Sequence, residues 1–305
     1  MSRLALVPAA LLAVVTAIAG CGGAGASPPA DADAVQVVAT TTILADLVAQ
    51  VGGEHVAVNS LVPKGGEVHT FDPTPSDVRR LADADLVVRN GLGLDDWLAD
   101  LVADAGTGAP LVALAEDLSG VAYIAGDEPG EPVNPHLWLD VEYAAKYAER
   151  IAGVLADADP EHAADYEASL AAYATQLAAL DAEATQTLGS IPEADRSIIA
   201  FHDAFPYFAA AYGLTVDGTI VSAPGQDPSA GDLAGLIRAV EADGVKAILA
   251  EAQFNDDLAR TIADETGATV VSSLLTDSVG DAPQDTYVEA MRWNVEQVAA
   301  ALQAP

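Results

Sequence analysis

The stretch DPEHAADYEASLAAYATQLAALDAEATQTLG, residues 159–189, decides the fold that this sequence predicts. Asp159 is placed to cap a helix, Pro160 lies in its first turn, and Gly189 follows its end. Apolar side chains recur along it at helical spacing, as Tyr166, Leu170, Tyr173, Leu177, Leu180 and Leu188. At about 1.5 Å per residue the helix would reach about 40 Å, a length that suits a strut across a whole domain.

Strands alternate with helices on both sides of this predicted helix. Short apolar runs lie at 35–39, 56–63, 85–91 and 110–115 before it, and at 196–201, 214–220, 246–251 and 268–275 after it. Helical patterns separate these runs, and Ser76 and Ser229 are placed to cap two of them. The alternation predicts an α/β fold of two similar Rossmann-like lobes with central parallel sheets, joined by one long rigid linker helix. The expected bounds are 35–158 for the N-terminal lobe, 159–189 for the linker helix and 190–305 for the C-terminal lobe.

The N-terminal sequence MSRLALVPAALLAVVTAIAGCGG has the features of an export signal. A short basic start is followed by an apolar run too short for a membrane span, and the run ends in the lipobox-like Ile18-Ala19-Gly20-Cys21. Cys21 is the only cysteine, so the chain forms no internal disulfide. We expect a lipoprotein signal peptide at 1–20, lipidation of Cys21, a flexible tether at 21–34, and anchoring by lipid to the outer face of the cytoplasmic membrane. An uncleaved anchor helix and an unmodified cysteine are the alternatives.

The charge of the chain excludes one class of partner. Twelve Lys+Arg residues stand against 46 Asp+Glu residues, a net charge of −34. A field of that sign repels nucleic acid, so no nucleic-acid partner is expected. It also concentrates cations near the surface, but a solvated acidic surface explains most of this charge, and acidity alone does not identify a metal protein.

Three of the five histidines share one sequence context. They are His69 in GGEVHTFDPTPSDV (65–78), His136 in NPHLWLD (134–140) and His202 in SIIAFHDAF (197–205). Two follow predicted strands and one precedes a helix. Ligands of open α/β sheets bind outside the carboxyl ends of strands, so a site that uses all three lies in the cleft between the lobes.

Asp277 has the same placement, after the strand in VVSSLLTDSVG (270–280). Three imidazoles and one carboxylate form a suitable tetrahedral set for Zn²⁺. Taken singly, each histidine is more often a hydrogen-bonded core or turn residue, and Asp277 could cap a helix. Their shared placement in a histidine-poor chain favours a metal site. His55 and His162 are interpreted as solvated, and Trp138 as core packing beside the site.

These segments together resemble the ordered signatures of zinc and manganese solute-binding proteins of ABC transporters, and the resemblance covers Val35 to Leu302. It implies that His69, His136 and His202 are nitrogen ligands and Asp277 an oxygen ligand. Glu251 in ILAEAQF matches a family acid that would support a ligand or the hinge.

Three departures from the family pattern stand out. Val68 replaces a proline or an acid, which argues against an adjacent carboxylate ligand, and Asn134 stands where aspartate is common. The acidic loop at 116–132 contains no histidine run, so the metal-scavenging loop of some zinc-binding members is absent.

The resemblance implies a monomeric extracytoplasmic binding protein, not an enzyme. It would capture a divalent metal, with Zn²⁺ preferred, and deliver it to an ABC permease with its ATPase subunit. Zn²⁺ is favoured over Mn²⁺ because members with glutamate at the position of His202 look tuned to manganese. Unperturbed imidazoles would lose the metal below about pH 6. The alternatives are a manganese-specific member of the family, a zinc-dependent hydrolase with an open water position, and an adhesion or metal-sensing lipoprotein.

Overall fold

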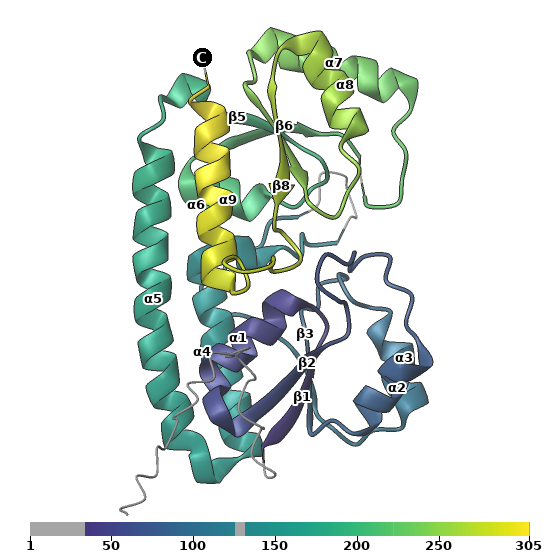
Figure 1. Ribbon diagram of the computed structural model, residues 1–305, viewed down its shortest axis with the longest axis vertical. Coiled ribbons are helices and arrows are strands. Elements are labelled where there is room, and N and C mark those ends of the chain that lie inside the picture. The colour runs from purple at the N-terminus through teal and green to yellow at the C-terminus, as the bar shows by residue number, and fades with distance from the viewer. Residues whose placement is uncertain (1–33, 126–131, 222, 305) are drawn as a thin grey trace, which may run out of the picture.

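The computed structural model describes residues 34–125, 132–221 and 223–304. Two parallel four-stranded sheets lie in two lobes, and the long helix α5 (Ala163–Gly189) runs beside both (Figure 1). The strand orders are β2-β1-β3-β4 and β6-β5-β7-β8, which is the same order counted within each lobe. The predicted pair of similar α/β lobes is therefore confirmed. The predicted signal peptide, Cys21 and nearly all of the tether lie outside the described residues.

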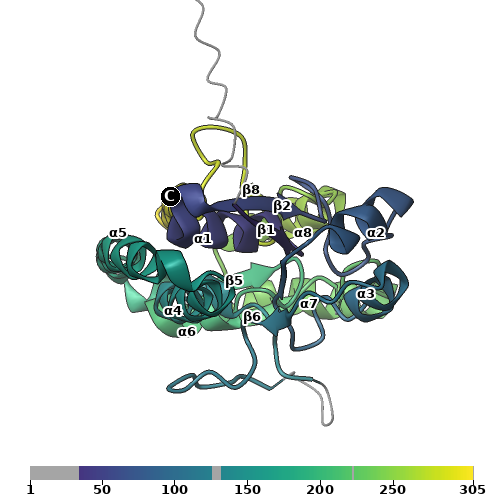
Figure 2. The same cartoon turned by 90° about the horizontal axis from the view of Figure 1, so that it is seen from below.

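The N-terminal lobe sandwiches its sheet between two helix layers (Figures 1 and 2). Its elements are β1 (Val35–Ala39), α1 (Thr42–Gly52), β2 (Val56–Ser60), α2 (Pro75–Ala82), β3 (Leu86–Arg89), α3 (Leu98–Ala105), β4 (Leu111–Ala113) and α4 (Val141–Ala158). Alternate residues of β1 face opposite ways. Val38 packs with α2 and α3, whereas Val37 and Ala39 belong to the core formed with α1 and α4.

The C-terminal lobe repeats this arrangement. Its elements are β5 (Ser197–Ala200), α6 (Pro206–Tyr212), β6 (Thr215–Thr219), α7 (Ala230–Asp243), β7 (Ala247–Glu251), α8 (Asp257–Thr266), β8 (Thr269–Leu274) and α9 (Tyr287–Leu302). Ile199 and Ile248 pack with α7 and α8, and Ile198 and Leu249 face the opposite core. Among the described residues, no helix is long and apolar enough to cross a bilayer.

One continuous core joins the two lobes. It includes inward-facing side chains of both sheets together with α1, α4, α5 and α9. The linker helix α5 contributes a stripe of buried side chains, namely Tyr166, Tyr173, Leu177, Leu180, Ala184 and Leu188. Each fully buried large apolar side chain contributes about 1.5–3 kcal/mol. A wide separation of the lobes would expose part of this core, so the packing opposes a large hinge opening.

Two predicted helix starts are wrong. Asp159 does not cap the linker helix, because residues Pro160–His162 first form a 3-10 turn and α5 begins at Ala163. The Asp159 carboxylate instead accepts hydrogen bonds from the Tyr166 hydroxyl and from Nδ1 of His162, both at 2.7 Å. The C-terminal end of α5 also differs from the prediction, because Gly189 is its last residue and does not follow the helix.

Helix α2 begins earlier than predicted. Its N-cap is Thr74 instead of Ser76, and Pro75 fills the first turn, where a missing N–H is tolerated. The Thr74 backbone N–H donates to the Asp77 carboxylate at 2.7 Å. The predicted Ser229 cap of α7 is confirmed by its side chain, which accepts from the Asp232 N–H at 3.2 Å.

Candidate metal centre

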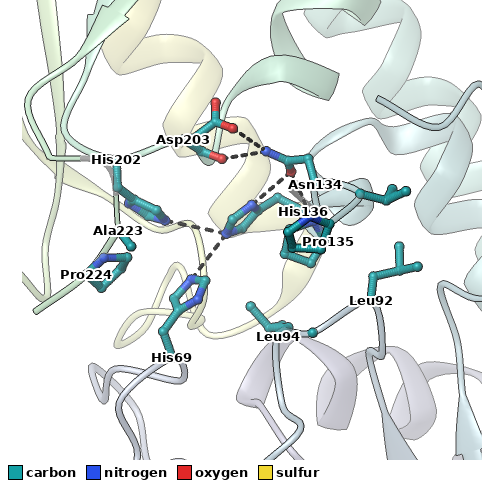
Figure 3. Close-up of a pocket in the computed structure, with 13 residues that line it drawn as sticks. His69, Leu92, Leu94, Asn134, Pro135, His136, His202, Asp203, Ala223 and Pro224 are labelled. Carbon is teal, nitrogen blue, oxygen red and sulfur yellow. Dashed lines mark hydrogen bonds between the residues drawn. The ribbon is translucent and has the colours of Figure 1, made fainter. Parts of the chain in front are cut away.

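Three histidine rings converge between the lobes (Figure 3). His69 lies on the loop between β2 and α2, His136 between β4 and α4, and His202 between β5 and α6. Nε2 of His136 is 3.3 Å from Nε2 of His69 and 3.4 Å from Nε2 of His202. The structure thus brings together the three predicted histidines, which border a cavity of about 280 Å³.

The spacing of these nitrogens suits a small tetrahedral cation. Two nitrogen ligands at about 2.0–2.1 Å from Zn²⁺ and at the tetrahedral angle are about 3.3–3.4 Å apart. The two measured separations fall in this interval. Both of these nitrogen pairs, each of which includes His136, therefore stand at the distance that a tetrahedral zinc ion would require.

A hydrogen-bond chain fixes the orientation of His136. The side-chain amide of Asn134 donates to the backbone oxygen of Asp203 at 2.7 Å and to its carboxylate at 2.9 Å. The amide oxygen of Asn134 is consequently turned toward His136, whose Nδ1 lies 3.0 Å away (Figure 3). Nδ1 then carries the proton, and the lone pair of Nε2 faces the site. Asn134 thus orients this imidazole from the position where the family commonly has aspartate.

Glu251 orients His202. Nδ1 of His202 forms an ion pair with Oε1 of Glu251 at 2.8 Å, and both side chains are buried. Burial by itself lowers the pKa of His202, but the neighbouring carboxylates, Glu251 first and then Asp277 and Glu67, together outweigh this effect and raise the pKa to about 9. Without a metal, His202 is therefore protonated at neutral pH, and a cation has to displace the proton on Nε2.

The other two histidines are neutral at the same pH. Burial lowers the pKa of His69 to about 3, with a smaller contribution from the charge of His202. Burial and the nearby His202 charge hold the pKa of His136 well below its usual range. Both rings therefore offer lone pairs to a cation without first losing a proton.

Asp277 lies on the loop between β8 and α9 and is 1% exposed. Its Oδ2 accepts from the Gln253 amide at 3.2 Å, whereas Oδ1 has no hydrogen-bond partner among the described residues. Burial raises the pKa of Asp277 to about 7. Asp277 does not cap α9, because Thr286 does, so the capping alternative is wrong. A buried carboxylate oxygen without a partner is costly, and a bound cation is one group that would satisfy it.

Glu67 is a carboxylate at this site that sequence reasoning missed. Its Oε1 accepts from the His69 backbone N–H at 2.7 Å, and its Oε2 is buried without a partner among the described residues. The neighbouring Val68 is fully buried in the core of the N-terminal lobe, as expected of a non-ligand. The sequence contained a signal for this carboxylate, because Glu67 is an acid two residues before His69 on the same glycine loop.

Hydrogen bonds from the N-terminal lobe hold the loop that carries Asp277 on both sides. The Trp138 indole N–H donates to the Thr276 carbonyl at 2.7 Å. On the other side, the Ser278 hydroxyl accepts from the Gly65 N–H at 2.9 Å and pairs with the Thr42 hydroxyl at 3.0 Å. Trp138 is 2% exposed, which agrees with its predicted packing role beside the site.

The remaining two histidines lie elsewhere. His55 and His162 stack with ring centroids 3.8 Å apart, and Nε2 of His55 is 3.3 Å from an Asp165 carboxylate oxygen. Both are partly buried and partly exposed to solvent, so the interpretation of solvated positions holds only in part. Neither belongs to a group of described residues spaced to hold an ion.

Sequence comparisons connect the chain with metal transport. The sequence model of the family described as zinc-uptake complex component A, periplasmic, matches residues 37–301. The metal ABC transporter substrate-binding lipoprotein SsaB of Streptococcus sanguinis is 29% identical over 310 residues, with 99% of each chain covered. The manganese-binding lipoprotein MntA of Halalkalibacterium halodurans is 29% identical over 294 residues, with 96% of each covered.

Solved structures share the fold. The periplasmic zinc-binding protein TroA from Treponema pallidum superposes with a TM-score of 0.81 at 26% identity, covering 89% of this chain and 100% of that one. A manganese-bound periplasmic metal-binding protein from Candidatus Liberibacter asiaticus gives a TM-score of 0.80 at 22% identity, covering 88% and 99%. At 22% identity, the likeness to the Liberibacter protein shows a shared fold and nothing more.

Proposed function

The chain belongs to the family of periplasmic zinc-uptake component A proteins, solute-binding components of metal ABC transporters and not enzymes, and we propose that its own cargo is Zn²⁺. Membership in this family excludes the hydrolase alternative. The observation that carries the proposal is the convergence of three imidazole nitrogens within 4.8 Å of one another. Two of the nitrogen pairs lie at tetrahedral separations, and two of the rings are neutral at pH 7. His69, His136 and His202 are the proposed nitrogen ligands, and Asp277 the proposed oxygen ligand.

The donor set supports zinc over manganese. Imidazole suits Zn²⁺, whereas Mn²⁺ prefers carboxylate, carbonyl and water oxygen, and intrinsic affinity rises from Mn²⁺ to Zn²⁺. Glu251 and Asn134 act through the ligands by fixing His202 and His136. The manganese alternative keeps its own support, because relatives are named for manganese and, in Streptococcus pyogenes, for iron.

Competition between the two metals tests the proposal. We expect the purified chain to bind one Zn²⁺ ion and to exchange bound Mn²⁺ for Zn²⁺ when both are supplied equally. Elemental analysis of the protein after dialysis against the mixture measures this. A preference for Mn²⁺ under these conditions would contradict the zinc assignment and favour the manganese-specific alternative.

The same proposal places the protein outside the cytoplasmic membrane as a monomer that serves a permease and its ATPase. The lipobox-like Ile18–Cys21, the lone Cys21 and the lipoprotein names of the relatives support an anchor at Cys21. This assignment concerns residues outside the described part of the chain.

Cys21→Ala tests the anchor. We expect the variant to lose its lipid anchor, because no thiol remains to accept the lipid. The protein should then appear in the medium or as an uncut precursor. Cell fractionation and mass spectrometry of the N-terminus measure this. Unchanged fractionation and unchanged mass would contradict lipidation, and Ser27→Ala, in the same predicted tether, is the control.

A further inference from the structure

Trp97 is the last residue of the loop that joins β3 to α3, residues 90–97. Its indole N–H donates to the carbonyl of Val68 at 3.0 Å, and its ring packs on Phe71 with the ring centroids 4.9 Å apart. Val68 directly precedes the proposed ligand His69, and Phe71 lies two residues after it. Trp97 therefore holds the chain on both sides of this histidine.

Asn90, the first residue of the same loop, contacts the chain beside His136. Its side-chain amide donates to the carbonyl of Pro135, directly before His136, at 3.0 Å. Its amide oxygen accepts from the Tyr147 hydroxyl at 2.7 Å, and the side chain is fully buried. Each proposed ligand of the N-terminal lobe thus follows a backbone carbonyl that the 90–97 loop holds.

Asp95 fixes the shape of this loop. It is fully buried, and its carboxylate accepts from the Thr40 hydroxyl at 2.8 Å and from the Gly91 N–H at 3.0 Å. Gly91, Leu92 and Gly93 all have left-handed backbone, with φ of 86°, 55° and 86°. Leu92, which borders the cavity of the three histidines (Figure 3), is strained there, and such a conformation persists only where the surroundings determine it. None of these bonds involves a proposed metal ligand, so the loop keeps its shape whether or not the site is filled.

We propose that the 90–97 loop positions two of the ligands, with Trp97 acting on His69 and Asn90 acting on His136. This inference rests on the proposed function and deepens it, because it names the residues that set the ligand geometry. Since the peptide bond is planar, a fixed carbonyl also fixes the N–H and Cα of the residue that follows. One rigid loop therefore sets the 3.3 Å separation between the Nε2 atoms of the two rings before the metal arrives.

Trp97→Phe removes the indole N–H but leaves an aromatic ring against Phe71. We expect Zn²⁺ affinity to fall about tenfold, because the approach of the chain to His69 is no longer fixed. The matched control is Trp293→Phe. The Trp293 indole N–H donates at 2.9 Å to the Ser273 carbonyl, which lies within β8 and not directly before a proposed ligand. This control should bind Zn²⁺ as the wild type does, and calorimetric titration of the purified chains with Zn²⁺ measures both.

A double-mutant cycle shows whether Trp97 acts through His69. In the His69→Ala background, Trp97→Phe should change Zn²⁺ affinity by less than about twofold, whereas a general loss of stability would cost the same in both backgrounds. In the His136→Ala background, the loss of about tenfold should persist. Wild-type affinity in Trp97→Phe, or an equal loss with and without His69, would overturn the inference. Failure of the proposed function is distinguishable, because His69→Ala would then retain full Zn²⁺ affinity.

The wild-type chain gives a second readout that does not depend on the folding of a variant. The Trp97 indole proton should resist exchange with deuterium as well before zinc is added as after, because the loop and not the ion sets its bond to Val68. Nuclear magnetic resonance of the ¹⁵N-labelled, assigned protein measures this exchange. Rapid exchange of the Trp97 indole proton in the zinc-free protein would show that the loop does not hold the Val68 carbonyl, and would overturn the inference.

Discussion

Replacing His136 with alanine should weaken Zn²⁺ binding by at least about a hundredfold, since loss of outer partners alone costs about 10–100-fold at metal sites. His202→Ala and His69→Ala should have effects of the same order, because each removes one of three converging nitrogens. Asp277→Ala should cost less if water replaces the carboxylate oxygen. Glu251→Gln loosens His202 without removing a ligand, but it also removes the carboxylate that keeps His202 protonated. Its loss of zinc affinity should therefore be smaller than that of any ligand variant.

Calorimetric titration of each purified variant measures these losses, with circular dichroism to show that the variant is folded. His162→Ala is the matched control, because it removes an imidazole that lies outside the ion-holding groups and should leave Zn²⁺ affinity unchanged. Full zinc affinity after His202→Ala would show that the three-nitrogen centre is not the binding site.

Zinc affinity should fall as the pH falls from about 9, well above the pH 6 that unperturbed histidines would give. The neutral imidazole of His202 is the binding form, and the Glu251 carboxylate keeps the protonated form populated up to a pKa of about 9. Between pH 9 and 7, each unit of acidification should therefore weaken binding about tenfold. Below the Asp277 pKa of about 7, a second proton competes with zinc, this time for the Asp277 carboxylate. The loss of zinc affinity should then approach about a hundredfold per pH unit.

Proton release on binding measures this directly. Zinc titrations in buffers of different ionisation enthalpy should show about one proton released at pH 8 and about two at pH 6. Because His69 and His136 are already unprotonated, they should release no further protons on zinc binding. In the Glu251→Gln variant, the proton release at pH 8 should largely disappear, because His202 is no longer held protonated. Zinc binding at pH 8 that releases no proton from the wild type would contradict the assigned state of His202.

The positions of His69 and His202 could be predicted because a parallel α/β fold brings strand ends together whatever the details of packing. His136 precedes α4 instead, and the resemblance of NPHLWLD to a family signature placed it at the site. His202, for example, lies two residues after the end of β5, and the end of that strand could be read from the sequence. Alternation of strands and helices is likewise a local pattern, which explains why the two lobes were predictable.

Features that depend on contacts between distant segments could not be predicted in the same way. Glu67 meets Asp277 only because Gly65 and Ser278, on loops of different lobes, are hydrogen-bonded. The stacking of His55 on His162 requires the 3-10 turn after α1 and the 3-10 turn before α5 to meet in space. Asp159 resembles a cap in sequence, but Tyr166 and His162 engage its carboxylate instead.

Crystals of the zinc-loaded protein, measured on both sides of the zinc absorption edge, test the central claim most directly. We predict one strong anomalous peak per chain, within bonding distance of Nε2 of His69, His136 and His202. A peak at any other position, such as beside the stacked His55 and His162, or no peak in protein that carries one equivalent of zinc, would contradict the account.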